Sequence, residues 1–213
     1  MNKDIIRSAL SEAMRRRFEE LREAINTRLD EFARIPEDEY FYELCYCLLT
    51  PQSKARAADV VVKILQKRRF AENSFDPTEI LASPNNYIRF HNTKARRLSA
   101  AKDQINAIRN LLSEGATPKR ERDWLTANVK GLGMKEASHF LRNIGRRGLA
   151  IIDRHIIKHL NYCGIEVEAE KMGSRRYYEE VERRWLEFCD SAGITIDEMD
   201  LLFWSAETGE ILK

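Results

Sequence analysis

The 213-residue chain has little of what marks disulfide-stapled, metal-clustered or membrane-embedded proteins. Its 4 cysteines match neither a compact zinc site nor a disulfide framework, and they lie at Cys45, Cys47, Cys163 and Cys189. No apolar run approaches the length of a membrane span, and the charged stretch 1–17 lacks the apolar segment of a signal peptide. We therefore expect buried, reduced cysteines in a cytoplasmic protein that makes no membrane contact.

Strand-like alternation of apolar and polar residues is also absent, and helical spacing takes its place. Phe18, Leu21, Ile25, Leu29 and Phe32 recur at steps of three and four residues, which predicts one face of a long first helix. The apolar residues of 41–49 predict a second, buried helix that ends before Pro51. The sequence predicts an all-α fold.

Several later helices have start signals in the sequence. Thr50-Pro51 and Thr117-Pro118 place a hydroxyl cap before a proline at the first helical position. Asp76-Pro77-Thr78-Glu79 adds a glutamate three residues after the cap. Asn92 is the expected cap of a helix that carries Leu98 and Ile105.

Charge is unevenly distributed along the chain. Residues 44–165 hold 22 Lys/Arg and 10 Asp/Glu, whereas the two ends hold 14 Lys/Arg and 24 Asp/Glu. A basic centre between acidic ends favours one face built for a polyanion, although solvated helix faces alone also produce such sorting.

The most informative stretch runs from Trp124 to Leu141. A helix to about Asn128 is followed by Val-Lys-Gly-Leu-Gly and by a second helix that begins near Met134. Two glycines on either side of Leu132 suit a tight turn with positive φ angles and a bare backbone. Exposed amides at a helix N-terminus are a binding site for phosphate.

This segment resembles the helix-hairpin-helix motif of the base-excision DNA glycosylases. The whole chain is similar to the archaeal-type 8-oxoguanine DNA glycosylase/AP lyase class, most distinctively in 200–213 and also in 48–55 and 90–95. The resemblance implies two helical lobes around a cleft and excision of 8-oxoguanine followed by β-elimination. The closely spaced cysteines that hold an iron–sulfur cluster in the endonuclease III branch are missing, so we expect no cluster.

The resemblance also assigns the catalytic pair. Lys135 matches the nucleophile of the bifunctional members, and Asp153, which lies 18 residues later, matches their essential aspartate. The helix dipole and partial burial both favour the neutral amine, which can attack a sugar carbon. Asp153 is also a good helix cap, and its charge suits an oxocarbenium-like transition state.

Further residues are matched to DNA and to the lesion. Gln52 and Phe90 align with residues that plug the duplex after base flipping, although Phe90 is equally suited to a core. The expected backbone contacts are Arg89, Lys94, Arg96, Arg97, Lys130, Gly131 and Gly133. Trp204 is the expected wall of the base pocket, and the α-carboxylate of Lys213 the expected acceptor for N7–H.

The hairpin of this family often holds a monovalent or calcium ion on backbone carbonyls, which match Ala127, Val129 and Leu132 here. His139 lies four residues after Lys135 and is expected to pack or be solvated. His155 and His159 are four apart without a third ligand nearby, so we expect no zinc.

We expect one lobe from 1–34 and 151–213 and a central lobe from 35–150, with the hairpin at 124–141. Damaged double-stranded DNA is the expected partner of a monomer in the cytoplasm, associated with the nucleoid. Two alternatives are open: a related glycosylase for another damaged base, and a non-catalytic hairpin module that only binds DNA. A helical protein-interaction scaffold would leave the Gly-Leu-Gly-x-Lys pattern unexplained.

Overall fold

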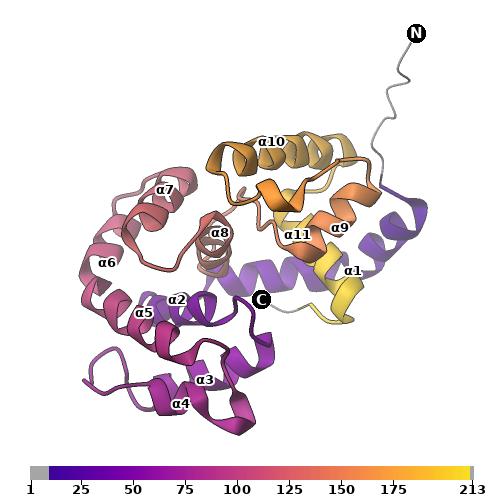
Figure 1. Ribbon diagram of the computed structural model, residues 1–213. Helices are drawn as coiled ribbons and strands as arrows, with labels where there is room; N and C mark the ends of the chain where they lie inside the picture. The colour runs from indigo at the N-terminus through magenta and orange to yellow at the C-terminus, as the bar shows by residue number, and fades with distance from the viewer. Residues whose placement is uncertain (1–9, 212–213) are drawn as a thin grey trace. The chain divides into compact units, whose positions relative to one another are not determined.

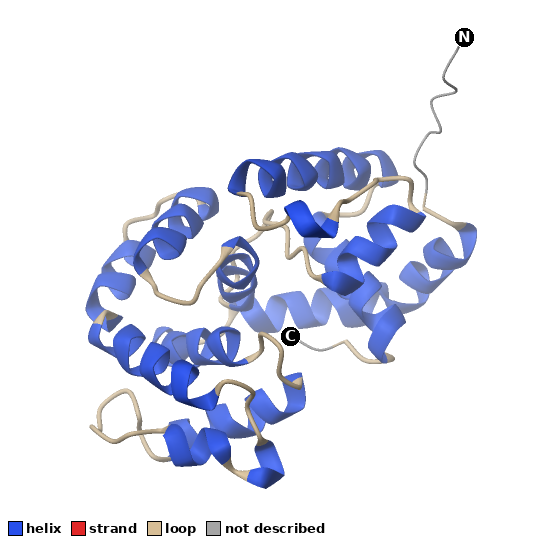
Figure 2. Cartoon of the chain, in the orientation of Figure 1, coloured by secondary structure: helices blue, strands red, loops and turns tan. Residues whose placement is uncertain are grey.

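The computed structural model describes residues 10–211 of the chain. Regular structure in this range consists of helices, and no strand occurs between residues 10 and 211 (Figure 2). The predicted all-α class is confirmed. In the same residues, no helix is both long and apolar enough to cross a membrane. All four cysteines are free thiols in the core, as predicted.

Contacts within the chain divide it into two compact units. Within the described residues, the terminal unit comprises 10–34 and 145–211, and the central unit runs from Ile35 to Ile144. The second boundary lies six residues before the expected one at 150/151, because the segment after Gly145 bonds within the terminal unit. Gly148 N donates to Asp197 Oδ2 at 2.9 Å, and Ala150 N donates to Glu182 Oε1 at 2.8 Å.

The central unit is built around α2, in which every residue from Phe41 to Leu49 is buried. Helices α3, α5 and α8 pack against it (Figure 1). The elements of this unit are η1 (Glu37–Glu39), α2 (Tyr40–Leu49), α3 (Ala55–Lys67), α4 (Thr78–Ala82), η2 (Pro84–Asn86), α5 (His91–Asp103), α6 (Ile105–Ser113), α7 (Pro118–Asn128) and α8 (Met134–Asn143).

The predicted helix starts of this unit are correct in one case. Thr117 caps α7 through a hydrogen bond from Arg120 N, at 3.4 Å. The predicted start at Thr50-Pro51 is wrong, because Gln52 adopts a left-handed φ of 56° and α3 begins only at Ala55. Asn92 lies inside α5, whose cap position is Phe90.

The start of α4 is a mixed case. Its cap position is Pro77, one residue later than expected. Asp76 nevertheless accepts the amide of Thr78 at 2.9 Å, so the carboxylate still satisfies a free donor at the start of the helix.

The terminal unit packs α11 against α1, α9 and α10 (Figure 1). The predicted apolar stripe of α1 is confirmed for Phe18, Ile25, Leu29 and Phe32, which are buried, whereas Leu21 is only half-buried. The elements of this unit are α1 (Glu12–Ala33), α9 (Arg154–Tyr162), η3 (Ala169–Lys171), α10 (Arg175–Ala192) and α11 (Ile196–Thr208). Trp185 of α10 is wholly buried and stacks on Phe203 of α11.

The segment before α9 is held by hydrogen bonds on both sides of Ile151. Tyr178 of α10 accepts the amide of Ile152 at 3.1 Å and donates its hydroxyl to Ala150 O at 2.8 Å. The chain therefore enters α9 from a fixed position, and this sets the place of Asp153 within the terminal unit.

Candidate active site

The hairpin predicted from the sequence joins α7 to α8 in the central unit. Leu132 is 5% exposed, and its amide donates to Val129 O at 3.1 Å. Gly131 has a φ of 105°, which favours glycine. The expectation for the second glycine is wrong, since Gly133 has an extended φ of −92°.

Two contacts fix the hairpin in place. Arg122 of α7 is buried and donates to Ser138 Oγ of α8 at 3.1 Å. The amide of Gly133, at the cap position of α8, donates to Glu136 Oε2 at 3.3 Å. Glu136 therefore satisfies one of the donors that every helix start leaves free.

Lys135 lies in the first turn of α8, as predicted. Its side chain is 27% exposed, and its Nζ lies 3.0 Å from Glu136 Oε1. Glu136 was not expected to take part in the site, although a glutamate three residues after a cap position is a recognisable signal. One carboxylate thus caps the helix and contacts the predicted nucleophile. His139, one turn later, packs edge-on against Tyr46.

Cationic side chains lie in the hairpin and against it within the central unit. Arg97 of α5 lies against Gly131, so closely that a Cβ on this glycine would be 2.6 Å from Arg97 Cδ. The Nε of Arg97 is buried and has no hydrogen-bond partner among the residues that the structure describes. Lys130 in the hairpin and Arg96 on α5 are exposed.

The two predicted duplex plugs are both exposed, in the loops before α3 and α5. Gln52 has a φ of 56° and Phe90 a φ of 61°, both left-handed. Phe90 is 51% exposed, so it is not a core residue, and the guanidinium of Arg89 lies 5.0 Å from its ring centroid. A surface aromatic next to an arginine is available to a nucleic acid.

The prediction for Lys94 is wrong. It was expected to contact the DNA backbone, but its side chain is 2% exposed. Its Nζ donates to Leu49 O and Pro51 O, each at 2.6 Å, and to Ser53 Oγ at 3.0 Å. Burial, followed by the charges of Arg97 and Lys135, lowers the pKa of Lys94 to about 8. A phosphate on the surface cannot reach this ammonium.

Asp153 lies in the terminal unit, at the cap position of α9. Its Oδ1 accepts the amides of His155 at 2.8 Å and Ile156 at 2.9 Å. Its predicted function as a cap is confirmed. Among the described residues, no hydrogen bond is made to its other oxygen, Oδ2.

One carboxylate of α11, Glu207, contacts three side chains of α9 and was not expected to contribute. Its oxygens lie 2.8 Å from Lys158 Nζ, 3.0 Å from His159 Nε2 and 3.4 Å from His155 Nδ1. The hydrogen bond from Lys158 lowers the pKa of Glu207, and burial lowers the pKa of His159. No local pattern in the sequence indicates this cluster, because Lys158 and Glu207 are 49 residues apart.

Trp204 of α11 is half-buried and meets the ring of His155 edge-on, with centroids 5.2 Å apart. The indole therefore lies against the first turn of the helix that Asp153 caps. Its Nε1 is buried without a hydrogen-bond partner in the described part of the chain. Lys213, the predicted acceptor for the lesion, lies outside the described residues.

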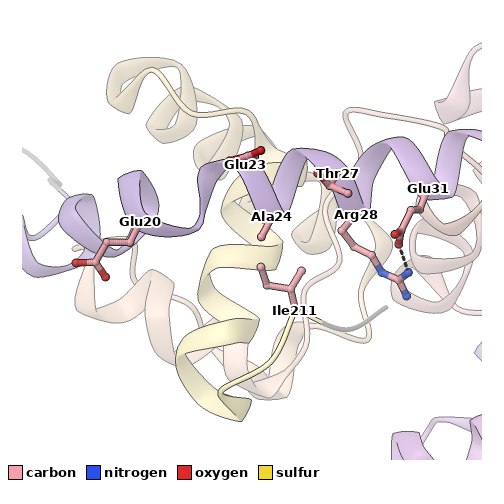
Figure 3. Close-up of a pocket in the computed structure, with 7 residues that line it drawn as sticks. All are labelled: Glu20, Glu23, Ala24, Thr27, Arg28, Glu31 and Ile211. Carbon is pink, nitrogen blue, oxygen red and sulfur yellow. Dashed lines mark hydrogen bonds and ion pairs between the residues drawn. The ribbon is translucent and has the colours of Figure 1, made fainter.

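A pocket of about 540 Å³ lies elsewhere in the terminal unit, between α1 and Ile211 (Figure 3). Its lining includes Glu20, Glu23 and Glu31, with Arg28 beside Glu31. None of the predicted site residues within the described range 10–211 lines it. Three carboxylates make it unsuited to a phosphate backbone.

The described residues thus bring the predicted groups together in two sets. The central unit holds Lys135, the hairpin glycines, the basic residues of α5 and the two exposed plugs. The terminal unit holds Asp153 and Trp204.

Comparison with known proteins matches residues 25–194 to the family model of 8-oxoguanine DNA glycosylase. An 8-oxoguanine DNA glycosylase/AP lyase of Korarchaeum cryptofilum is 37% identical over 205 residues, covering 96% of this chain and 97% of its own. One of Fusobacterium nucleatum is 34% identical, with 92% and 94% covered. The crystal structure of the Methanocaldococcus jannaschii enzyme in complex with a 15mer DNA containing 8-oxoguanine is 31% identical, with a TM-score of 0.83 over 95% of this chain and 100% of that one.

The chain belongs to the 8-oxoguanine DNA glycosylase family. The family predicted from the hairpin and the C-terminal stretch is thereby confirmed, and so is the enzyme class, a DNA glycosylase with AP lyase activity. This excludes the alternative of a hairpin module that only binds DNA.

Proposed function

We propose that this protein excises 8-oxoguanine from double-stranded DNA and then cleaves the strand at the abasic site, with Lys135 as nucleophile and Asp153 as catalytic carboxylate. The observation that carries the proposal is the start of α8. There a partly exposed lysine follows a hairpin with a left-handed glycine, and its amine contacts a carboxylate.

Lys135 attacks as a neutral amine, so its Nζ must first pass a proton to an acceptor such as the Glu136 carboxylate, 3.0 Å away. Its Nζ attacks C1′ of the damaged nucleotide, the glycosidic bond breaks, and the base leaves with a proton. Opening of the sugar ring gives a Schiff base between Nζ and C1′, which acidifies C2′. Loss of the C2′ proton then expels the 3′ phosphate by β-elimination. A carboxylate oxygen of Asp153 supplies the negative charge that stabilises the cationic sugar.

The DNA interface is proposed on the central unit. The hairpin backbone at Gly131 and Gly133 and the side chains of Arg89, Arg96, Arg97 and Lys130 would hold phosphates. Gln52 and Phe90 would fill the gap left by the flipped base, and Trp204 would line the base pocket. The exposure of Phe90 beside Arg89 supports this assignment.

The hairpin carbonyls suit the ion implied by the family. Ala127 lies in the last turn of α7, where carbonyls have no intrahelical donor, and Val129 O accepts the amide of Leu132 while retaining a second lone pair. A monovalent ion or calcium held by Ala127, Val129 and Leu132 would add positive charge for a phosphate. We expect no iron–sulfur cluster and a functional monomer.

Borohydride trapping on a duplex with one 8-oxoguanine tests the proposal, because reduction fixes the Schiff base covalently. We expect an adduct with the wild type and none with Lys135→Gln. An exposed lysine on the same unit, Lys63→Gln, serves as the matched control and should trap normally.

Two other results would contradict parts of the proposal. An adduct only with an oxidised pyrimidine would retain the mechanism and overturn the substrate. An adduct that survives Lys135→Gln would overturn the nucleophile.

A further inference from the structure

The ammonium group of Lys94 is buried, and its hydrogen bonds go to groups outside α5, the helix to which Lys94 belongs. Its three acceptors are Leu49 O, at the last residue of α2, and Pro51 O and Ser53 Oγ in the loop that joins α2 to α3. An ammonium has three N–H donors, so these acceptors satisfy it fully. The loop is therefore fastened to the first turn of α5, 41 to 45 residues away along the chain.

The same loop is fastened to the residues just before α5. Ser53 Oγ accepts the amide of Arg89 at 3.0 Å, in addition to its bond from Lys94. Ile88 next to it is wholly buried, and its amide donates to Leu81 O at 2.9 Å. One hydroxyl thus connects the loop of Gln52 to the loop of Phe90.

The two loops share a further property. Gln52 and Phe90 both adopt left-handed backbone conformations, with φ of 56° and 61°. Such conformations are unfavourable for non-glycine residues and persist where the surroundings over-determine them. Both side chains are exposed, so their own packing does not supply the constraint.

We propose that Lys94 is a positioning residue that, with Ser53, fixes the Gln52 loop to the Phe90 loop, so that the two exposed side chains enter the duplex as one rigid wedge. We call this arrangement the Lys94 clamp, and it rests on the proposed function of Gln52 and Phe90 as plugs. A positioning residue acts through loop geometry, whereas a phosphate contact acts through charge at the surface. The two therefore affect different measurements.

The test compares Lys94→Met with Arg96→Met, which removes a charge from the exposed face of the same helix. The probe is an 8-oxoguanine duplex with 2-aminopurine beside the lesion, whose fluorescence rises when the base leaves the stack. For Lys94→Met we expect unchanged salt dependence of binding, a reduced fluorescence rise at saturating protein, and single-turnover excision slowed by about tenfold. For Arg96→Met we expect a salt slope lower by about 1 and a normal fluorescence rise at saturation.

The clamp is wrong if Lys94→Met reduces the salt slope as Arg96→Met does, or if it leaves the fluorescence rise intact. Circular dichroism checks that the variant folds. If Lys94→Met does not fold, Ser53→Ala takes its place, because it removes the shared hydroxyl and leaves both carbonyl contacts of Lys94. The same loss of fluorescence is expected for Ser53→Ala, and a normal rise would overturn the clamp.

Phe90→Ala separates the clamp from the function on which it rests. If Phe90→Ala leaves base flipping intact, the plug assignment fails and the clamp fails with it. If Phe90→Ala abolishes flipping and Lys94→Met does not, the clamp alone fails. If both the plug assignment and the clamp are right, the two residues act through one element. Lys94→Met should then slow excision by a smaller factor in the Phe90→Ala background than in the wild-type background.

Discussion

The starts of α8 and α9 hold their functional side chains in different ways. At α8 the cap position is a glycine, and Lys135 in the first turn extends on a flexible stem to its neighbour Glu136. At α9 the cap is Asp153 itself, whose Oδ1 accepts two amides. A nucleophile has to reach a sugar carbon, whereas a carboxylate that acts through its field needs a fixed position. The start of α8 is suited to a side chain that has to move, and the start of α9 to a carboxylate that has to stay in place.

Asp153 therefore has two functions, capping α9 and supplying a negative charge, and substitution can separate them. Asn is as good a helix cap as Asp, so Asp153→Asn should unfold within a few degrees of the wild type. It removes the charge, and we expect excision to slow by about two to four orders of magnitude. Asp153→Ala loses the cap as well, which costs about 1 kcal/mol of stability, or roughly 2–4 °C in Tm.

Single-turnover excision and thermal unfolding of both variants measure the two functions. If Asp153→Asn lowers the Tm as much as Asp153→Ala does, then Asp153 does not stabilise the fold by capping α9. If Asp153→Asn excises at the wild-type rate, the catalytic assignment fails.

The start of α8 is expected to be sensitive at Gly131 and tolerant at Gly133. Gly131→Ala places a Cβ 2.6 Å from Arg97 Cδ at a φ of 105°, so the hairpin or the arginine must move. The strain is about 1–3 kcal/mol, and we expect DNA affinity to fall by roughly tenfold. Gly133→Ala has an ordinary φ, and its new Cβ meets only the end of the Glu136 side chain, at 3.0 Å.

Fluorescence anisotropy with an undamaged duplex checks this contrast, since it measures binding without excision. Equal losses for the two glycine variants would mean that the left-handed turn and the placement of Arg97 are not what the hairpin offers to DNA.

How far the sequence predicts the molecule depends on the range of the interactions. The apolar face of α1, the cap at Asp153 and the two helices of the hairpin depend on residues a few positions apart, and all were predicted. Thr50-Pro51 and Thr117-Pro118 are the same local signal, yet only the second begins a helix. The loop after Thr50 is held by Lys94, more than 40 residues later, and no local pattern contains this contact.

The site follows the same rule. Lys135 and Asp153 stand in recognisable motifs, whereas Glu207 reaches α9 from another helix. The error at Lys94 has the same origin: a lysine in a basic stretch is usually solvated, and only the fold shows that this one is buried.

Substitution of Glu207 is expected to have the smallest effect on excision, and it tests whether Asp153 depends on a fixed position of α9. It contacts Lys158, His159 and His155, so it fixes the first two turns of α9 and through them the carboxylate at its start. Glu207→Gln should slow excision by less than Asp153→Asn does and leave the salt dependence of DNA binding unchanged. Glu210→Gln, on the exposed end of the same chain segment, is the matched control.

The pH dependence of unfolding distinguishes this contact from simple packing. The pKa of Glu207 is lowered in the folded protein, so its stabilisation is present above about 4.5, its ordinary value, and is lost as the pH falls further. The pKa of His159 is lowered as well, so its burial costs stability once the pH drops below its ordinary value of 6.5. Both effects weaken the α9–α11 contact in acid. The Tm of Glu207→Gln should therefore fall less steeply than that of the wild type below about pH 4.5, and parallel curves would show that the carboxylate contributes no charge-dependent positioning of α9.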